Sequence, residues 1–223
     1  MPLTALVFDA YGTLFDVHSV VRTAEQLFPG HGKPLSKLWR TKQLEYTWQR
    51  SLMRRHADFN QVTRDALRHA CAALQLPFTE AALEQLMEAY RHLEVFADAE
   101  VAISALKGKT KLAILSNGAP DMLNAVVANS PLQDAFTAVL SVEGAGVFKP
   151  DPRVYQLTVD RFGVETASIG FVSSNGWDAA GAKAFGFTVF WVNRARAPVE
   201  ELGVTPDYEL NSLAELPSRC VTA

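Results

Sequence analysis

The chain has 223 residues, of which 48% are hydrophobic and 20% charged, and its formal net charge is −3. These values are ordinary for a globular protein, and the length allows one large domain or two smaller ones. Because 21 Lys and Arg residues are balanced by 24 Asp and Glu residues, the charge gives no support to a nucleic-acid partner.

The first predicted element is a short strand over residues 5–8, which ends at Asp9. Its residues are all apolar, as expected of a strand that is covered on both faces. A carboxylate at the end of a buried strand is costly to desolvate unless it is paired or used. Ligands of open parallel sheets bind beyond the carboxyl ends of the strands, so Asp9 is a candidate active-site residue. A plain turn is the alternative, since Asp and the nearby Gly12 are common in turns.

The next eighty residues or so are predicted to form helices only, with no strand. Apolar residues recur three and four positions apart over 34–55, 60–76 and 79–93. Thr79 is a typical helix start, and Pro77 ends the helix before it.

From about residue 97, predicted strands and helices alternate. Strands are expected over 111–115, 138–141, 168–172, 187–192 and 207–210, and helices over 99–106, 120–129, 151–162 and 177–185, with a last helix at the C-terminus. This alternation predicts an α/β fold with a doubly wound parallel sheet. We therefore expect a core domain of residues 1–15 and 97–223, and a helical cap domain of residues 16–96 inserted over one end of the sheet.

Polar side chains stand at the carboxyl ends of four successive predicted strands: Asp9, Ser116 with Asn117, Lys149, and the segment 173–178. A parallel sheet brings these ends to one edge. Each has a simpler explanation when it is taken alone. Lys149 could be a solvated lysine, and Asp178 a first-turn acid that the helix dipole favours. Their joint occurrence indicates a catalytic site instead.

The cysteines and the apolar runs bear on location. Cys71 and Cys220 lie far apart and form no Cys-x-x-Cys motif, which is typical of a reducing compartment. The sequence opens on a predicted strand rather than on a signal segment, and the apolar run 187–192 is too short to span a bilayer. We expect a cytoplasmic protein with no membrane partner.

Four motifs follow one another along the chain: Phe8-Asp9-Ala10-Tyr11-Gly12-Thr13-Leu14, Ser116-Asn117-Gly118, Lys149-Pro150-Asp151 and Ser173-Ser174-Asn175-Gly176-Trp177-Asp178. In sequence and in order they resemble the motifs of the haloacid dehalogenase superfamily. The resemblance implies a Rossmann-like core with an inserted cap domain, and Asp9 as a nucleophile.

Two motif positions separate the reaction classes of that superfamily. Most members are magnesium-dependent phosphohydrolases, with a second Asp two residues after the nucleophile and Gly-Asp in the last motif. Here those positions hold Tyr11 and Ser173-Ser174. Magnesium prefers several hard oxygen ligands, so the sequence favours a reaction with no metal and no cofactor. A magnesium phosphohydrolase stays the alternative, and a non-catalytic binding protein that keeps the fold is a third possibility.

The segment 38–48 is similar to the first cap helix of the L-2-haloacid dehalogenase branch. Within it, Arg40 shares a helix face with Leu44 and Trp48. An arginine on an apolar stripe either reaches water or meets an anion. The resemblance implies hydrolysis of (S)-2-haloacids to (R)-2-hydroxyacids and halide, through an ester of Asp9 and with inversion. It also implies a homodimer and a small-molecule substrate.

The site residues carried over by this resemblance fall into two groups. The catalytic group is Asp9, Thr13, Arg40, Ser116, Lys149, Tyr155, Ser173, Asn175 and Asp178. The substrate-binding group is Tyr11, Arg40, Leu44, Phe59, Ser116, Asn117 and Trp177.

Each group has expected roles. Arg40 and Asn117 are expected to receive the halide, and Ser116 and Lys149 to hold the substrate carboxylate. Asp178 is the expected general base, oriented by Lys149 and Asn175, while Thr13 and Ser173 are expected to hydrogen-bond Asp9. Tyr155 could equally be a core aromatic residue, and ordinary packing stays the alternative for each aromatic residue of the apolar wall.

Overall fold

The structure is a computed structural model that describes residues 3–220. Its centre is a six-stranded sheet in the order β5-β4-β1-β6-β7-β8, with every neighbouring pair parallel. The strands are β1 (Ala5–Phe8), β4 (Lys111–Ser116), β5 (Ala138–Ser141), β6 (Ile169–Ser173), β7 (Thr188–Val192) and β8 (Tyr208–Leu210).

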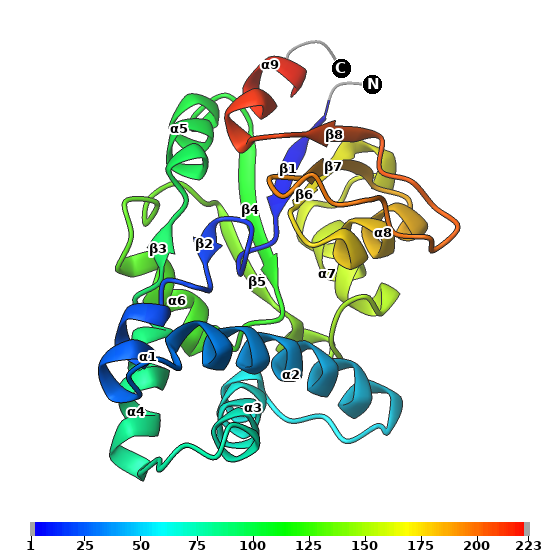
Figure 1. Ribbon diagram of the computed structural model, residues 1–223. Coiled ribbons are helices and arrows are strands. Elements are labelled where there is room, and N and C mark those ends of the chain that lie inside the picture. The colour runs from blue at the N-terminus through cyan, green and yellow to red at the C-terminus, as the bar shows by residue number, and fades with distance from the viewer. Residues whose placement is uncertain (1–2, 221–223) are drawn as a thin grey trace.

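Helices cover both faces of this sheet. One face carries α5 (Ala97–Leu106), α6 (Pro120–Ala128) and α9 (Leu216–Cys220), and the other carries α7 (Pro152–Phe162) and α8 (Gly176–Phe185) (Figure 1). Short 3₁₀ turns lie at η1 (Val142–Gly144), η2 (Thr166–Ser168) and η3 (Leu213–Glu215). The predicted doubly wound α/β architecture is confirmed, with the strand order reversing beside β1.

A separate layer of helices lies beyond one end of the sheet (Figure 1). It consists of α1 (Val21–Leu27), α2 (Gly32–Leu52), α3 (Phe59–Ala73) and α4 (Glu80–Ala89). The prediction that this segment contains no strand is wrong, because β2 (Phe15–Asp16) pairs antiparallel with β3 (Glu94–Val95) where the segment leaves and rejoins the core. Two residues are too few to show a strand periodicity. The division into a core domain and a cap domain stays a prediction.

Local sequence signals account for several helix boundaries. The Thr79 side chain accepts a hydrogen bond from the Ala82 N–H and so caps α4, as the sequence predicts for this helix start. Asp151 caps α7 in the same way, Pro152 follows in the first turn, and Gly163 ends the helix in a left-handed conformation.

The central strand is fully covered, since Leu6, Val7 and Phe8 are at most 1% exposed. Polar residues that are at most 5% exposed begin where the strands end: Asp9, Thr13, Ser116, Lys149, Ser173 and Asp178. Burial of so many polar groups at one sheet edge is costly unless they satisfy one another, and this edge is where the candidate site lies. No helix between residues 3 and 220 is long and apolar enough to cross a membrane.

Candidate active site

Lys149 lies between two carboxylates at the carboxyl edge of the sheet. Its Nζ is 3.1 Å from Asp9 Oδ1 and 2.9 Å from Asp178 Oδ2, and its side chain is 0% exposed. Burial alone would lower the pKa of Lys149, but the charges of Asp178 and Asp9 outweigh this effect and raise it. The ammonium group therefore stays charged and neutralises part of the charge of both acids.

The Asp9 carboxylate is held from three sides. Thr13 Oγ1 donates to Asp9 Oδ2 at 3.0 Å, Asn175 Nδ2 donates to the same oxygen at 2.8 Å, and Lys149 binds the other oxygen. The turn after β1 brings Thr13 back to Asp9, and Gly12 adopts φ = 91° within it, a conformation that favours glycine. A carboxylate fixed in this way has little freedom to lose when it reacts.

Asp178 is fully buried in the first turn of α8. Its Oδ1 accepts a hydrogen bond from the Tyr155 hydroxyl at 2.8 Å, and its Oδ2 accepts one from Ser173 Oγ at 3.1 Å. Burial raises the pKa of Asp178 to about 6, with Lys149 opposing the shift and Asp9 adding to it. A carboxyl with such a pKa can take up a proton close to neutral pH.

Tyr155 combines both of the roles that the sequence left open. Its ring is 0% exposed and packs against Phe171 and Phe187 in the core, while its hydroxyl reaches Asp178. Burial, followed by the charge of Asp178, raises the pKa of Tyr155 well above its usual value. Tyr155 is thus a neutral hydrogen-bond donor at this site.

Two of the expected contacts are wrong in detail. Ser173 Oγ donates to Asp178 rather than to Asp9, because the first turn of α8 folds back over the end of β6. The Asn175 side chain orients Asp9 and the Tyr11 carbonyl rather than Asp178, whose N–H donates to the Asn175 backbone carbonyl instead. Both residues belong to the cluster, but Ser173 binds Asp178 and the Asn175 side chain binds Asp9.

The helical layer reaches this cluster through Arg40. Arg40 Nη2 donates to the Tyr11 carbonyl at 3.2 Å, and Nη1 donates to Gln43 Oε1 at 2.8 Å. The Tyr11 ring stacks on Phe59 of α3, with ring centroids 5.6 Å apart. Arg40 therefore lies over the loop that follows Asp9, beside an apolar wall, and Leu44 is half-buried one helical turn further along α2.

Ser116 and Asn117 hold the neighbouring loops. Asn117 Oδ1 accepts a hydrogen bond from the Lys149 N–H at 3.0 Å, and Ser116 Oγ accepts one from the Gly118 N–H at 3.1 Å. Added at Gly118, a Cβ atom would lie 2.8 Å from the Tyr11 ring, so the loop after β4 packs tightly against the loop after β1. Both polar side chains lie at the same sheet edge as Asp9.

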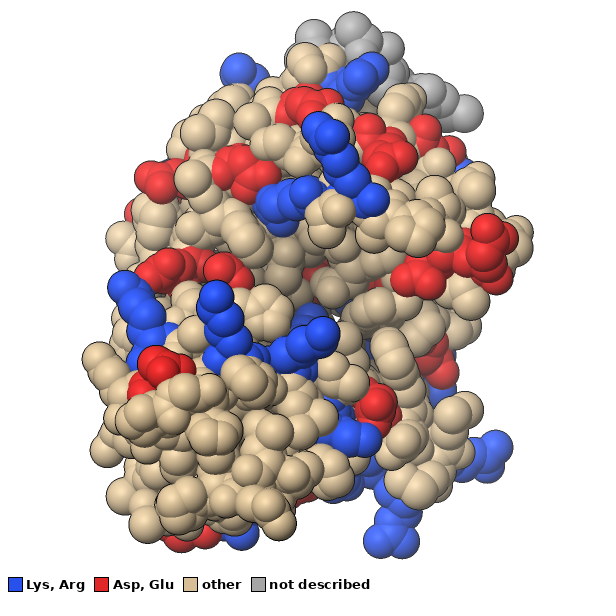
Figure 2. Space-filling model, viewed as in Figure 1, with Lys and Arg blue, Asp and Glu red and all other residues tan. Residues whose placement is uncertain are grey.

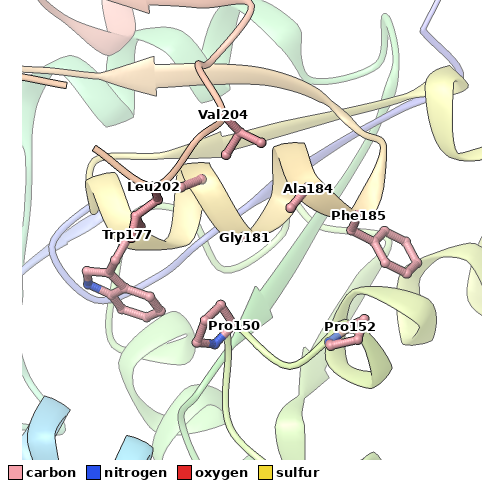
Figure 3. A pocket seen from close by; sticks show the side chains of 9 residues that line it. Pro150, Pro152, Trp177, Gly181, Ala184, Phe185, Leu202 and Val204 are labelled. Carbon is pink, nitrogen blue, oxygen red and sulfur yellow. The ribbon is translucent and has the colours of Figure 1, made fainter. Parts of the chain in front are cut away.

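Trp177, at the start of α8, contacts the helical layer. It meets Trp48 of α2 edge to face at 5.5 Å. It also lines one end of an apolar pocket of about 450 Å³ on the outer side of α8, with Pro150 close by (Figure 3). This outer pocket has no titratable side chain in its lining, which suits apolar contact rather than a reaction.

A second pocket of about 360 Å³ lies between the helical layer and the core and reaches Lys149. Its lining includes Trp48 and Ser51 of α2 and the loop 148–151. Figure 2 shows a hollow between the two layers, with Lys and Arg side chains gathered along the edge of the helical layer that faces it. The lining of this second pocket thus includes one residue of the buried cluster, Lys149.

Sequence reasoning missed two residues of this region. Arg194 follows β7 at the same sheet edge, where its Nη1 donates to Ser174 Oγ at 2.8 Å and its Nη2 to the Thr13 carbonyl at 3.0 Å. The strand-end rule that singled out Asp9 could have found it. Gln43 is 0% exposed beneath Arg40, and nothing in the apolar periodicity of α2 points to it.

No group of three or more His, Cys, Asp or Glu side chains is arranged to hold a metal ion within residues 3–220.

The chain is similar to known hydrolases. The family model for haloacid dehalogenase-like hydrolases matches residues 3–186. An (S)-2-haloacid dehalogenase of Pseudomonas sp. (strain YL) is 49% identical over 212 residues, covering 95% of this chain and 91% of the relative. Another, from Pseudomonas putida, is 48% identical over 216 residues, covering 96% of each chain.

A solved structure agrees with these matches. The L-2-haloacid dehalogenase from Xanthobacter autotrophicus with chloropropionic acid covalently bound superposes with a TM-score of 0.93 at 43% identity, covering 99% of both chains.

Proposed function

The chain belongs to the haloacid dehalogenase-like hydrolases, and on that premise we propose that it is an (S)-2-haloacid dehalogenase. It hydrolyses the carbon–halide bond of (S)-2-haloacids and gives (R)-2-hydroxyacids and halide. The observation that carries this proposal is the buried group of Asp9, Lys149 and Asp178, in which one lysine links a carboxylate directly after β1 to another in the first turn of α8. Such a group provides a nucleophile and a base side by side.

In the first step, Asp9 attacks the halogen-bearing carbon from the side opposite the halogen. A bond forms between a carboxylate oxygen and this carbon, and the halide leaves with the electron pair, so the carbon inverts. Thr13, Asn175 and Lys149 hold the nucleophile in place. A well-oriented pair of reactants can save roughly 7–11 kcal/mol of the barrier. Covalent bonding of chloropropionic acid in the Xanthobacter relative supports this step.

Anion recognition accompanies the first step. We assign the departing halide to Arg40 and Asn117, and the substrate carboxylate to Ser116, Lys149 and backbone N–H groups of the loop after Asp9. The basic edge of the hollow in Figure 2 supports an anionic substrate, because a local positive field draws anions to a protein of net charge −3. Tyr11, Leu44, Phe59 and Trp177 would face the alkyl part.

In the second step, water attacks the acyl carbon of the Asp9 ester, and Asp178 takes the proton from that water. The bond between the acyl carbon and the ester oxygen breaks, and the second proton of the attacking water passes to that oxygen. This frees the hydroxyacid and restores the Asp9 carboxylate, and Asp178 then releases its proton to solvent. The raised pKa of Asp178 supports its role as the base. Lys149, Ser173 and Tyr155 hold Asp178 for this step.

The phosphohydrolase alternative is not favoured. A phosphohydrolase of this superfamily would need acidic residues where this chain has Tyr11 and Ser174. Ser174 Oγ instead accepts a hydrogen bond from the guanidinium group of Arg194 at 2.8 Å. A fixed cation at this position would repel a divalent metal ion.

The test uses L- and D-2-chloropropionate, each with and without a chelator. We expect chloride and D-lactate from the L form only, at a rate that the chelator does not change. Turnover in water labelled with oxygen-18 should place the label in the Asp9 side chain. Activity on a phosphate ester that the chelator abolishes, or turnover that never labels Asp9, would contradict the proposal.

Residues 16–96 act, in this proposal, as a cap domain over a core of residues 1–15 and 97–223. Polar pairs between the two parts support it: Asn60 and Arg91 both bind Asp121, and His56 binds Glu143 at 2.9 Å. Surface pairs of this kind are individually weak, which suits a border that must admit substrate.

Oligomeric state and location complete the proposal. We propose a homodimer, supported by Leu202, which is 60% exposed beside the outer apolar pocket. Size-exclusion chromatography with light scattering tests this. We also propose a cytoplasmic location, which the free thiols of Cys71 and Cys220 support.

A further inference from the structure

We propose that Gln43 is a positioning residue for halide departure, because it fixes the guanidinium group of Arg40 over the reaction site. The inference rests on the proposed function, in which Arg40 receives the halide. The hydrogen bonds of the Gln43 side chain go to Arg40, Thr63 and Tyr90 rather than to Asp9 or the loop after it. It acts through Arg40, which lies one helical turn earlier on α2.

Gln43 is a buried amide whose polar atoms are all used. Its Oε1 accepts one hydrogen bond from Arg40 Nη1 at 2.8 Å and another from the Tyr90 hydroxyl at 3.1 Å. Its Nε2 donates to Thr63 Oγ1 at 2.8 Å. The side chain is 0% exposed, so water does not compete for these contacts. A buried amide with this set of partners has one fixed position.

The orientation of the amide is also fixed. Thr63 Oγ1 donates its one hydrogen to the Phe59 carbonyl at 2.6 Å, so towards Gln43 it can only accept. If the amide were flipped, its NH₂ group would face the donors of Arg40, and its oxygen would face a hydroxyl with no hydrogen to give. The chain of contacts from Phe59 to Gln43 therefore presents an acceptor to Arg40.

This acceptor determines where the guanidinium group can lie. Arg40 has a second anchor, the Tyr11 carbonyl at 3.2 Å, which belongs to the loop after Asp9. Two anchors restrict the rotation of the guanidinium group and hold it next to the nucleophile loop. A guanidinium group has five N–H donors, so donors beyond these two contacts can face an anion. Without Gln43, Arg40 keeps one anchor and can turn about it.

The consequence is specific to the bond that breaks. As Asp9 attacks, negative charge develops on the halogen, and donors fixed at that place stabilise it. Chloride is a poorer leaving group than bromide and depends more on such donors. Loss of the Gln43 contact should therefore slow chloride release more than bromide release. A purely structural role, which ties α2 to α3 and α4, would lower stability and leave this preference unchanged.

The test compares kcat/KM for L-2-chloropropionate and L-2-bromopropionate, because this ratio reports all steps through carbon–halide cleavage. Gln43→Met keeps the length of the side chain and removes its hydrogen bonds. We expect kcat/KM for the chloro acid to fall about ten-fold. We expect the bromo-to-chloro preference to rise at least about three-fold.

Two control variants separate this effect from destabilisation. Thr47→Val changes another buried polar residue of α2, whose hydroxyl donates to the Leu44 carbonyl. Gln49→Met places the same substitution at an exposed position of the same helix. Both should keep the bromo-to-chloro preference of the unmodified protein, and Thr47→Val should lower the melting temperature.

A second variant covers the case in which Gln43→Met does not fold. Gln43→Glu keeps an acceptor for Arg40 but adds a negative charge beside the place where the halide forms, so the bromo-to-chloro preference should again rise. An unchanged preference in a folded variant at position 43 would overturn the inference. If the unmodified protein released no halide at all, the proposed function would fail instead, and the two failures are therefore distinguishable.

Discussion

Lys149 Nζ donates a hydrogen bond to Asp178 Oδ2 at 2.9 Å, at a place where both side chains are 0% exposed. The same ammonium group binds Asp9, so one cation stands between the nucleophile and the base. Removing either acid would leave the lysine partly unpaired in the protein interior, which is costly. The two proposed steps are therefore linked through a single charge.

Replacing Asp178 with Asn should stop the reaction after its first step. The amide cannot take a proton from water, so the Asp9 ester should accumulate. Intact-mass measurement after mixing with L-2-chloropropionate should show a gain equal to the substrate without its chloride, located in a peptide containing Asp9. Asp9→Asn should show no gain, and Asp160→Asn, an exposed control, should turn over normally. Full turnover by Asp178→Asn would contradict the assigned base.

The rate of ester hydrolysis should fall at low pH, with a midpoint below about 6. Burial and the charge of Asp9 raise the pKa of Asp178 to about 6 in the free protein, and the ester removes the charge of Asp9. Once the Asp178 carboxyl binds a proton, it can no longer accept one from water. The Tyr155 hydrogen bond acts in the opposite direction and lowers that pKa. Tyr155→Phe should therefore move the midpoint of the profile to higher pH. Single-turnover measurements across the pH range would show this, and a midpoint that moved downward would count against it.

Replacing Arg194 with Met should lower both activity and stability. Its guanidinium group binds both carboxylate oxygens of Asp98, at 2.8 and 2.9 Å, in addition to Ser174 and the Thr13 carbonyl. Leaving Asp98 without this partner should cost about 1–3 kcal/mol of unfolding free energy. Because the loop with Thr13 also loosens, we expect kcat to fall about ten-fold.

The pH dependence of this loss tests its cause. Burial alone would raise the pKa of Asp98, but Arg194, the Leu213 N–H and Ser212 outweigh it and lower the pKa below its usual 3.8. The stabilisation is therefore present above pH 3.8 and is lost as the pH falls through the folded-state pKa. Denaturant unfolding should show the variant and the unmodified protein converging at low pH. Arg153→Met, on an exposed pair, should change stability by less than about 0.5 kcal/mol.

Gly181→Ala should displace Tyr155, which holds the proposed base Asp178. A Cβ atom at this position would lie 2.6 Å from the Tyr155 hydroxyl and 2.5 Å from Pro150 Cβ. Overpacking of this kind costs about 1–3 kcal/mol, more than the gain in helix propensity of up to about 1 kcal/mol. We expect slower ester hydrolysis, because Tyr155 moves away from Asp178, and a lower melting temperature. Gly144→Ala, whose Cβ would be 3.4 Å from Leu157, is the matched control, and equal effects of both would contradict this account.

The strand ends could be predicted well from the sequence, for a physical reason. Apolar runs fix the strands, and a parallel sheet then forces residues such as Asp9 and Ser173 to one edge, whatever lies between them in the chain. Contacts within the edge could not be predicted. Whether Ser173 donates a hydrogen bond to Asp9 or to Asp178 depends on how the first turn of α8 packs over the end of β6. The periodicity of the sequence carries no information on this packing.

Contacts between segments that lie far apart in the sequence were also beyond sequence reasoning. Gln43 is a polar residue in an amphipathic helix, and only the packing of α2 on α3 shows that it is buried. Arg194 contacts Thr13 across 181 positions of sequence, and the short pair β2–β3 has too few residues for a pattern. Each depends on tertiary packing, which overrides local preference.

The edge-to-face contact of Trp48 with Trp177 joins α2 to the first turn of α8. The chain has four tryptophans, and the other two, Trp39 and Trp191, are at most 3% exposed. Indole emission responds to nearby rings and to water, so the intrinsic tryptophan fluorescence of the protein should depend on the contact between α2 and α8. A fluorescence change on mixing with a haloacid would report a change at this contact without any added dye.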